Sequence, residues 1–229
     1  MILKNIERLV ANRLYKTGKC MIHVGKCGGS SVKGAMQHAG IADQYTIAHT
    51  YPVAYSKDID YYIQLRHPIK RLISAYNWRH TRLLVDGDQH GKFHGELEAL
   101  KLYPSLEELA CDLYDGDHKN IRVHNAFNKI RHVKEGIHHH LKRIIRHDDF
   151  STQIQGVFHQ ENLDEDVRHI LGVEIVKKRN VNNRAVVTTE LSTKAYDNLK
   201  KFAENDLKTI KKLYDHKLIS DKMYDYYIT

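Results

Sequence analysis

The sequence predicts an α/β fold, in which a central parallel sheet is covered by helices on both faces in a three-layer sandwich. Short apolar runs alternate with amphipathic helical patterns along the chain, which is the order typical of parallel sheets. The hydrophobic content of 41% and the charged content of 28% are ordinary for a globular protein. Only 3 prolines and 13 glycines leave little room for long linkers, so we expect a single domain over residues 1–229.

The first third of the chain contains three of the expected strands. Each is a short apolar run that ends at a turn signal, and Pro68 suits the first turn of the helix after the third strand. We expect a helix over 2–14, a strand over Cys20–Val24, a helix over Ser31–His38, and strands over Tyr45–Ala48 and Tyr61–Leu65.

Residues 80–150 are predicted to form a helical insert. A capping box at Ser105 and Glu108 begins a helix that extends to Tyr114, and the basic, histidine-rich segment 119–147 is mostly helical in pattern. Beyond it we expect a strand over Gln153–Phe158, a helix over Leu163–Leu171, a strand over Val173–Val176 and a long helix over Thr193–His216.

The charge balance and the cysteines limit the function classes. Lys+Arg total 36 against 28 for Asp+Glu, which gives +8 and favours anionic partners without choosing among them. Cys20, Cys27 and Cys111 lack C-x-x-C spacing, so a disulfide framework or a zinc ribbon is not expected. No apolar stretch is long enough for a signal peptide core or a transmembrane segment, which predicts a cytoplasmic protein.

A glycine-rich turn follows the first predicted strand. In the segment 25–31, GKCGGSS, two adjacent glycines let backbone N–H groups face one concavity at the start of a helix, whose dipole favours an anion. Lys26 precedes the glycines, whereas a Walker A loop has its lysine after them. The alternative is a tight turn with a surface lysine.

Basic or titratable side chains follow each of the first three strands. Lys26, His49 and Arg66 all lie at or just beyond a predicted strand end. The carboxyl ends of parallel strands meet at one edge of the sheet, where ligands of such folds bind. Ser74 lies about two helical turns after Arg66, so both side chains are candidates to bind one phosphate. The alternative for this segment is a basic amphipathic helix.

The two segments together resemble the sulfotransferases that use PAPS, 3′-phosphoadenosine 5′-phosphosulfate. IHVGKCGGSS is similar to their 5′-phosphosulfate loop, typically H-V-P-K-T-G-G-T-S, and RHPIKRLISAY to their 3′-phosphate motif, typically R-[DN]-P-x-x-R-x-x-S-x-[YF]. The similarity is greatest to the carbohydrate branch that includes heparan sulfate 2-O-sulfotransferase. It spans 20–79 and 153–214 and leaves 80–150 unmatched. Gly25, Cys27 and His67 depart from the family pattern.

This resemblance implies a P-loop-like sandwich, PAPS as the sulfuryl donor, PAP as the product, and no metal. Lys26 would stabilise the oxygen that bridges sulfur and phosphorus, and Arg66 and Ser74 would bind the 3′-phosphate. The 5′-phosphate would be bound by the backbone N–H groups of Cys27, Gly28, Gly29, Ser30 and Ser31. Arg184, in a late loop, is a further candidate for cofactor binding.

The acceptor hydroxyl needs a base, and His49 is the candidate. Its unperturbed pKa suits proton removal at neutral pH, and the histidine-base branch of the family has a histidine in this region. The alternative is a solvated loop histidine, in which case His80, His132 and Glu135 become the candidates. Residues 80–150 would bind the acceptor, which we expect to be a carbohydrate or another hydroxyl-bearing small molecule.

Two other functions compete with sulfuryl transfer. One is a P-loop kinase for a small molecule or nucleotide, which the lysine position disfavours. The other is a non-enzymatic module that binds nucleic acid through the basic segment 119–147, although that segment contains no recognised nucleic-acid-binding motif.

Overall fold

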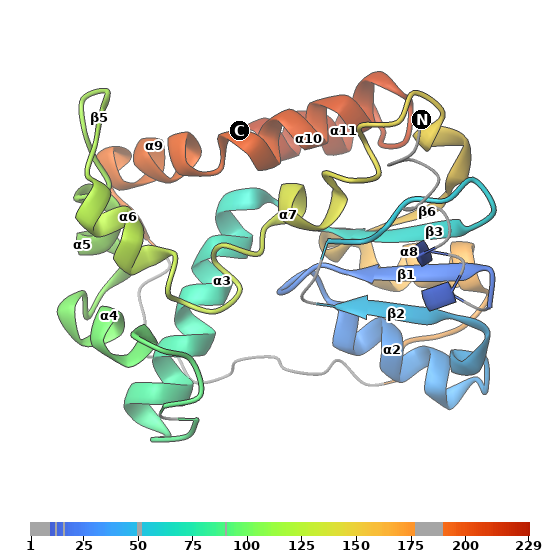
Figure 1. Cartoon of the computed structure of the whole chain (residues 1–229), viewed down its shortest axis with the longest axis horizontal. Coiled ribbons are helices and arrows are strands. Elements are labelled where there is room, and N and C mark those ends of the chain that lie inside the picture. Colours follow the sequence, from blue (N-terminus) through green and yellow to red (C-terminus); the bar gives the residue numbers. More distant parts are fainter. Residues whose placement is uncertain (1–9, 12, 16, 50–51, 90, 177–189) are drawn as a thin grey trace.

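A four-stranded parallel sheet forms the centre of the fold, as the sequence predicts (Figure 1). The computed structural model describes residues 10–11, 13–15, 17–49, 52–89, 91–176 and 190–229. The strands lie in the order β2-β1-β3-β6. Their bounds are Lys19–His23 for β1, Thr46–His49 for β2, Asp60–Leu65 for β3 and Ile154–His159 for β6. Each lies within one residue of its expected position.

The strand register brings the predicted side chains to one edge of the sheet. His23 at the end of β1 is paired with His49 at the end of β2, and Leu65 at the end of β3 is paired with His159 at the end of β6. The four carboxyl ends are therefore level with one another. The turns that leave β1, β3 and β6 all begin at this edge.

Helices α2 (Gly29–His38) and α8 (Leu163–Leu171) cover one face of the sheet. Met21 and Tyr62 point to this face and pack with Met36 and Val167 from the two helices. Successive strand residues point to opposite faces, so Cys20 and Ile22 pack on the other side.

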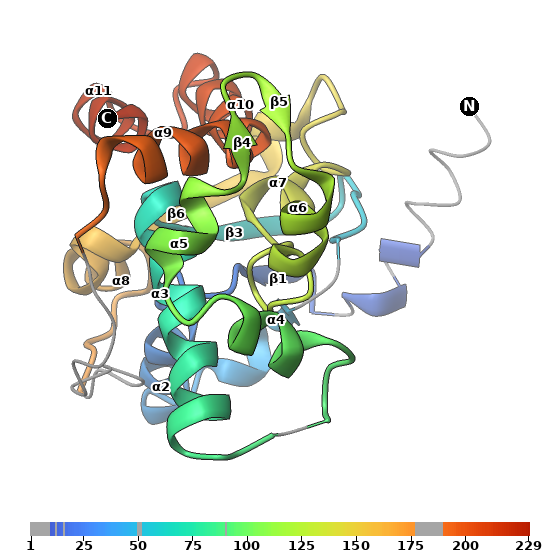
Figure 2. The same ribbon diagram turned by 90° about the vertical axis from the view of Figure 1, so that its left-hand side faces the viewer.

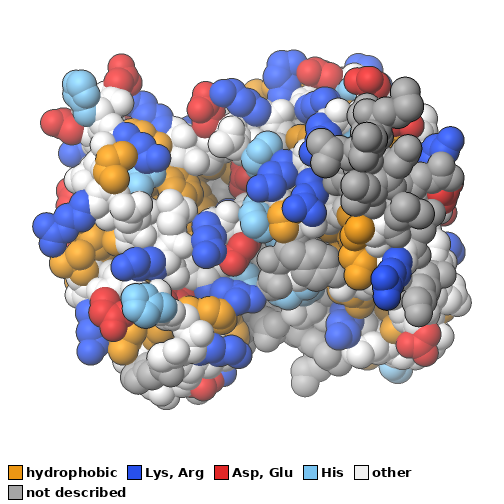
Figure 3. Space-filling model, viewed as in Figure 1, with side chains coloured by type: hydrophobic (Ala, Val, Ile, Leu, Met, Phe, Trp, Pro, Cys, Tyr) orange, Lys and Arg blue, Asp and Glu red, His pale blue; other side chains and the backbone are white. Residues whose placement is uncertain are grey.

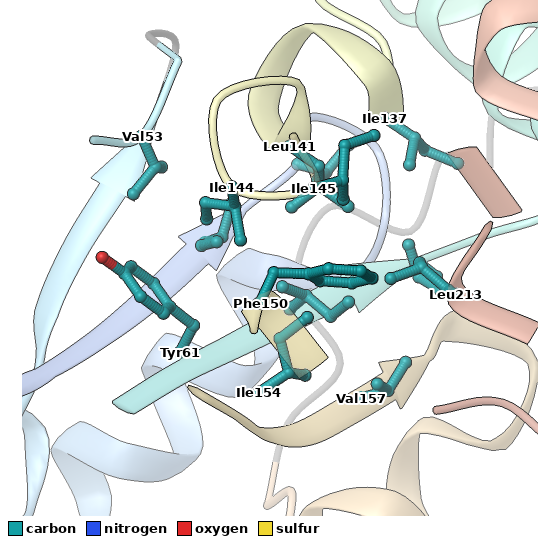
Figure 4. Close-up of a cluster of buried hydrophobic side chains, with 14 of the residues drawn as sticks. Val53, Tyr61, Ile137, Leu141, Ile144, Ile145, Phe150, Ile154, Val157 and Leu213 are labelled. Atoms are coloured by element: carbon teal, nitrogen blue, oxygen red, sulfur yellow. The ribbon is translucent and has the colours of Figure 1, made fainter. Parts of the chain in front are cut away.

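The second face is covered by α7 (Ile137–Leu141), α10 (Glu204–Asp215) and α11 (Asp221–Ile228). Figure 2 shows the helices of the C-terminal segment on one side of the sheet and α2 on the other. Ile144, Phe150 and Leu213 are completely buried against the strands (Figure 4). Burying side chains of this size contributes about 1.5–3 kcal/mol each, which fixes this layer on the sheet.

A second hydrophobic cluster surrounds α3 (Pro68–His80) and lies beside the sheet (Figure 1). Tyr76 and Phe127 are among its completely buried side chains. Its other elements are the π-helical turn Thr81–Val85 and the short helices α4 (Glu96–Leu102), α5 (Leu106–Cys111), α6 (Ile121–Phe127) and α9 (Thr193–Phe202). A hairpin of β4 (Tyr114–Asp115) and β5 (His118–Lys119) follows α5, and 3-10 turns lie at Ala42–Gln44, Phe150–Gln153 and Gln160–Asn162.

Three expected elements differ in the structure. Val173–Val176 form no strand, because Val173 and Ile175 bury their side chains against the cluster of α2 and α8 without pairing with the sheet. The expected long helix over Thr193–His216 breaks at Ala203 into α9 and α10. The helix expected to reach Tyr114 ends at Cys111.

The segment 119–147 contains only two short helices, α6 and α7, with turns between them. The helix expected over 2–14 lies mostly outside the described residues. None of the helices in the described part of the chain combines the length and the apolar character needed to span a bilayer.

Candidate functional site

The turn between β1 and α2 leaves backbone donors at the start of a helix. Gly28 is the N-cap of α2 and has a φ of +83°, and Lys26 also has a positive φ of +71°. The N–H groups of Cys27 and Ser31 bond to the carbonyls of Val24 and Gly28.

Within the described residues, the N–H groups of Gly28, Gly29 and Ser30 have no acceptor, and α2 has no side-chain cap and no acidic residue in its first turn. The helix N-terminus can therefore accept an anion through three consecutive donors.

Close packing explains why this turn contains glycine. A Cβ on Gly25 would lie 2.6 Å from Nδ1 of His132, and one on Gly28 would lie 2.6 Å from a methyl of Leu163. A Cβ on Gly29 would overlap the His23 ring. The glycines thus allow neighbouring side chains to enclose the turn, in addition to exposing the donors described above.

Lys26 carries a positive charge that no carboxylate of the described residues neutralises through an ion pair. Its Nζ lies 4.6 Å from the centre of the Trp78 ring, in a cation–π contact. Burial, followed by the charge of Arg66, lowers the pKa of Lys26 from 10.5 to about 8. Among the described residues Lys26 has no ion-pair partner, so an anion placed here would relieve both effects.

Arg66 lies beside the same turn. Its Nη1 donates to the carbonyl of Lys26 at 3.1 Å, and its buried Nε has no acceptor among the described residues. Ser74 and Trp78 are four residues apart on α3 and therefore share one face of that helix. Since Trp78 contacts Lys26, this face of α3 is the one nearest the turn.

His67 replaces the acidic or amide residue of the family pattern and still caps α3. Its Nδ1 accepts from the N–H of Ile69 at 3.1 Å. Burial, followed by the charge of Lys70, lowers the pKa of His67 to about 4, which keeps the ring neutral and able to accept. The N–H of His67 donates to Oε1 of Glu161 at 3.1 Å.

Three imidazoles gather at the ends of β1 and β2. The rings of His23 and His49 stack with centroids 4.2 Å apart, and the ring of His132 lies 5.8 Å from that of His49. Nδ1 of His49 lies 2.9 Å from the carbonyl oxygen of His23. A carbonyl only accepts, so Nδ1 carries the proton and Nε2 of neutral His49 has a free lone pair.

His23 and His132 are neutral neighbours of His49. Burial, followed by the proximity of His49, lowers the pKa of His23 to about 3, whereas burial and Arg131 lower that of His132 to about 2. Lys26 contributes to both shifts, so Lys26, His49 and these two rings share one electrostatic environment. The described residues include no group of three or more His, Cys, Asp or Glu side chains arranged to bind a metal ion.

The structure brings most of the predicted site residues to the carboxyl edge of the sheet. Lys26, Cys27, Gly28, Gly29, Ser30 and Ser31 lie in the turn or the first turn of α2, Arg66 contacts the turn, and His49 ends the neighbouring strand. Arg184 lies outside the described residues.

Two residues that the motifs do not name also lie in the site. Trp78 is half-buried against Lys26, and its spacing of four from Ser74 is the signal in the sequence that places both on one face of α3. His132 belongs to the insert that the resemblance leaves unmatched, where the sequence indicates it only as a substitute base, and its ring lies 5.8 Å from that of His49.

No protein-family model, curated protein or solved structure matches this chain. The likeness to sulfotransferases therefore rests on the two motifs and on the chemistry of the residues described above.

Proposed function

We propose that this chain is a sulfotransferase of P-loop-like fold, which moves a sulfuryl group from PAPS to the hydroxyl of an acceptor, with carbohydrates as the favoured class. The observation that carries the proposal is the uncompensated charge of Lys26 beside three free backbone N–H donors and Arg66. Buried cations without counter-charges are costly to a fold, and they are typical of sites that bind an anion.

The residues of the site fit a bisphosphate nucleotide. The N–H groups of Gly28, Gly29 and Ser30 suit a 5′-phosphate, and the free Nε of Arg66 together with the Ser74 hydroxyl suits a 3′-phosphate. PAPS would supply the activated sulfuryl group. Lys26 provides the mobile positive charge, which can leave the Trp78 ring for the donor.

The reaction would need one proton transfer and one displacement. Nε2 of His49 accepts the proton of the acceptor hydroxyl as its oxygen forms a bond to sulfur. The bond from sulfur to the bridging oxygen breaks, and its electron pair remains on the 5′-phosphate of PAP, where Lys26 neutralises the charge. His23 holds the reactive tautomer of His49 through its carbonyl.

Nucleotide selectivity tests the proposal. The chain has one tryptophan, Trp78, and this residue contacts Lys26, so its fluorescence reports ligands that draw Lys26 away. We expect PAP to change the fluorescence and to raise the melting temperature, with about 2.7 kcal/mol of added stability at ~100 times its Kd. AMP lacks the 3′-phosphate and should act much more weakly.

The matched controls are ATP with Mg²⁺, a DNA oligonucleotide and the Lys26→Ala variant. Equal responses to PAP and AMP would remove the role assigned to Arg66 and Ser74. A stronger response to ATP with Mg²⁺ would favour a kinase, and a response to DNA alone would favour a nucleic-acid-binding module.

A further inference from the structure

A cavity of about 250 Å³ lies apart from the turn that contains Lys26. It is open to solvent on one side and is lined by α3, by α7 with the segment that precedes it, and by the junction of α9 and α10. Neither Lys26 nor His49 lines it. On the face shown in Figure 3, Lys, Arg and His side chains gather near the middle of the molecule, where Figure 1 places α7.

The charged side chains that line the cavity are mostly positive. Arg71, Lys134 and Lys142 oppose a single carboxylate, that of Asp206. Asp206 already accepts from the N–H of His138 at 2.8 Å and forms an ion pair with Arg71 at 3.5 Å. Lys134 and Lys142 are exposed and have no ion-pair partner within the described part of the chain.

The cavity is also lined by two residues with buried nitrogen atoms that have no hydrogen-bond partner in the described part of the chain. Arg71 is only 1% exposed, and its two terminal nitrogens donate to the carbonyls of His132 and Val133. Its Nε is buried and has no acceptor among the described residues, and the same holds for Nε2 of His139. A buried donor without an acceptor is unfavourable unless a ligand or water satisfies it.

We propose that this cavity is a second anion site, which binds a phosphate, sulfate or carboxylate group between Arg71, His139 and the two lysines. Arg71 and His139 would supply desolvated donors, and Lys134 and Lys142 would supply positive charge at the rim. The proposal does not rest on sulfuryl transfer, because neither Lys26 nor His49 lines the cavity. Arg71 lies between the two places, since its Nη1 donates to the carbonyl of His132. Either a free anion or an acidic group on a larger acceptor offers this chemistry.

Titration of the whole chain with inorganic phosphate and, in parallel, with glucuronate tests the proposal. The titrations are done at pH 7 and constant ionic strength, with chloride as the reference salt, and are followed by calorimetry and by Trp78 fluorescence. We expect saturable binding of at least one of the two anions. The Lys134→Gln/Lys142→Gln double variant should bind it about tenfold more weakly or worse, since both charge-assisted contacts are lost.

Two matched variants locate the binding. Lys129→Gln and Arg143→Gln change exposed cations outside the cavity lining and should leave the affinity unchanged. Lys26→Ala should also retain the binding that calorimetry measures. A Trp78 fluorescence response that is present in the wild type and lost in Lys26→Ala reports anion binding at the turn and not in the cavity.

The anion that binds more tightly shows which kind of ligand the cavity takes. Tighter binding of glucuronate indicates an acidic group on an acceptor, and tighter binding of phosphate indicates a free anion. The proposal is overturned if neither anion binds saturably, if the double variant binds as the wild type does, or if Lys26→Ala alone abolishes the binding. These outcomes are independent of the response to PAP, so failure here leaves the sulfotransferase proposal unaffected.

Discussion

Two groups of cations lie beside α3, and they differ in what neutralises them. Near its C-terminal end, Arg79 donates to both oxygens of Glu96 at 2.8 and 2.7 Å, and the two side chains are 2% and 0% exposed. At the turn after β1, Arg66 donates to the carbonyl of Lys26 and the Lys26 ammonium lies over the Trp78 ring, and within the described part of the chain neither cation forms an ion pair with a carboxylate.

The difference distinguishes a structural pair from a site. Arg79 joins α3 to α4 and has the counter-charge of Glu96. The turn after β1 instead retains cations whose charge is unfavourable for folding. Such local conflicts are expected where a ligand completes the site.

The largest effect is expected at His49, if the uncompensated cations at the turn after β1 face a reactive centre. His49→Ala should lower the release of PAP from PAPS by about 10²–10⁴-fold, because no base then takes the proton of the acceptor or of water. PAP affinity, measured by Trp78 fluorescence, should stay close to that of the wild type. His49→Gln keeps a polar group without a base and should be as slow.

His38→Ala, at the exposed end of α2, is the matched control for that experiment. Wild-type turnover in His49→Ala would move the base to another residue, with the neighbouring ring of His132 as the first to examine.

The next largest effect is expected on the free energy of unfolding, at the ion pair of Arg79 and Glu96. Glu96→Gln should lower the free energy of unfolding by about 3–5 kcal/mol, because Arg79 is left buried without its counter-charge. The N–H of Arg131, which donates to Glu96 at 2.7 Å, loses part of its acceptor as well. Urea unfolding measures the change, and Glu98→Gln on the exposed face of α4 is the control. A change below about 1 kcal/mol would remove the contrast between the two regions.

The sheet was predictable from the sequence because its signals are local. Each strand is a short apolar run that ends at a turn, and the edge to which Lys26, His49 and Arg66 converge follows from parallel topology alone. Val173–Val176 shows the limit, since an apolar run also suits a segment that packs on helices without pairing.

The environment of the site was less predictable because it depends on contacts distant in sequence. The sequence around His132 does not indicate that its ring lies 5.8 Å from the ring of His49. Its position depends on Arg71, which is distant in the sequence and donates to the carbonyl of His132. The lone pair on Nε2 of His49 likewise depends on the carbonyl of His23, which only the register of β1 and β2 brings into place.

Removing the charge of Lys26 is expected to raise the free energy of unfolding, which is a smaller effect than that of Glu96→Gln and opposite in sign. The pKa of Lys26 is about 8 in the folded chain against 10.5 when unfolded, so the protonated amine opposes folding below pH 8. Lys26→Met should therefore raise the free energy of unfolding by about 1–2 kcal/mol at pH 7, after allowance for partial exposure. The gain should decline above pH 8 and vanish near 10.5.

Chemical unfolding at several pH values measures this gain. Lys33→Met, an exposed lysine of α2, should change stability little at any pH. A destabilised Lys26→Met would mean that the ammonium is already satisfied within the fold, and the two groups of cations would then be alike.

The smallest effect concerns the pH dependence of nucleotide affinity, and it depends on the proton of the Lys26 ammonium. A bisphosphate binds best to charged Lys26, whose pKa of about 8 in the free protein means that most molecules lose this charge by pH 9. PAP affinity should therefore fall about tenfold between pH 7 and pH 9. The phosphates of PAP are already fully ionised over most of this range, so they add little to the slope. Fluorescence titration of Trp78 measures the fall in the wild type, and calorimetry supplies the comparison in Lys26→Ala, where affinity should be lower and nearly independent of pH. Equal slopes in the two proteins would show that another group loses the proton, and Lys26 would then be a cation that the site does not use.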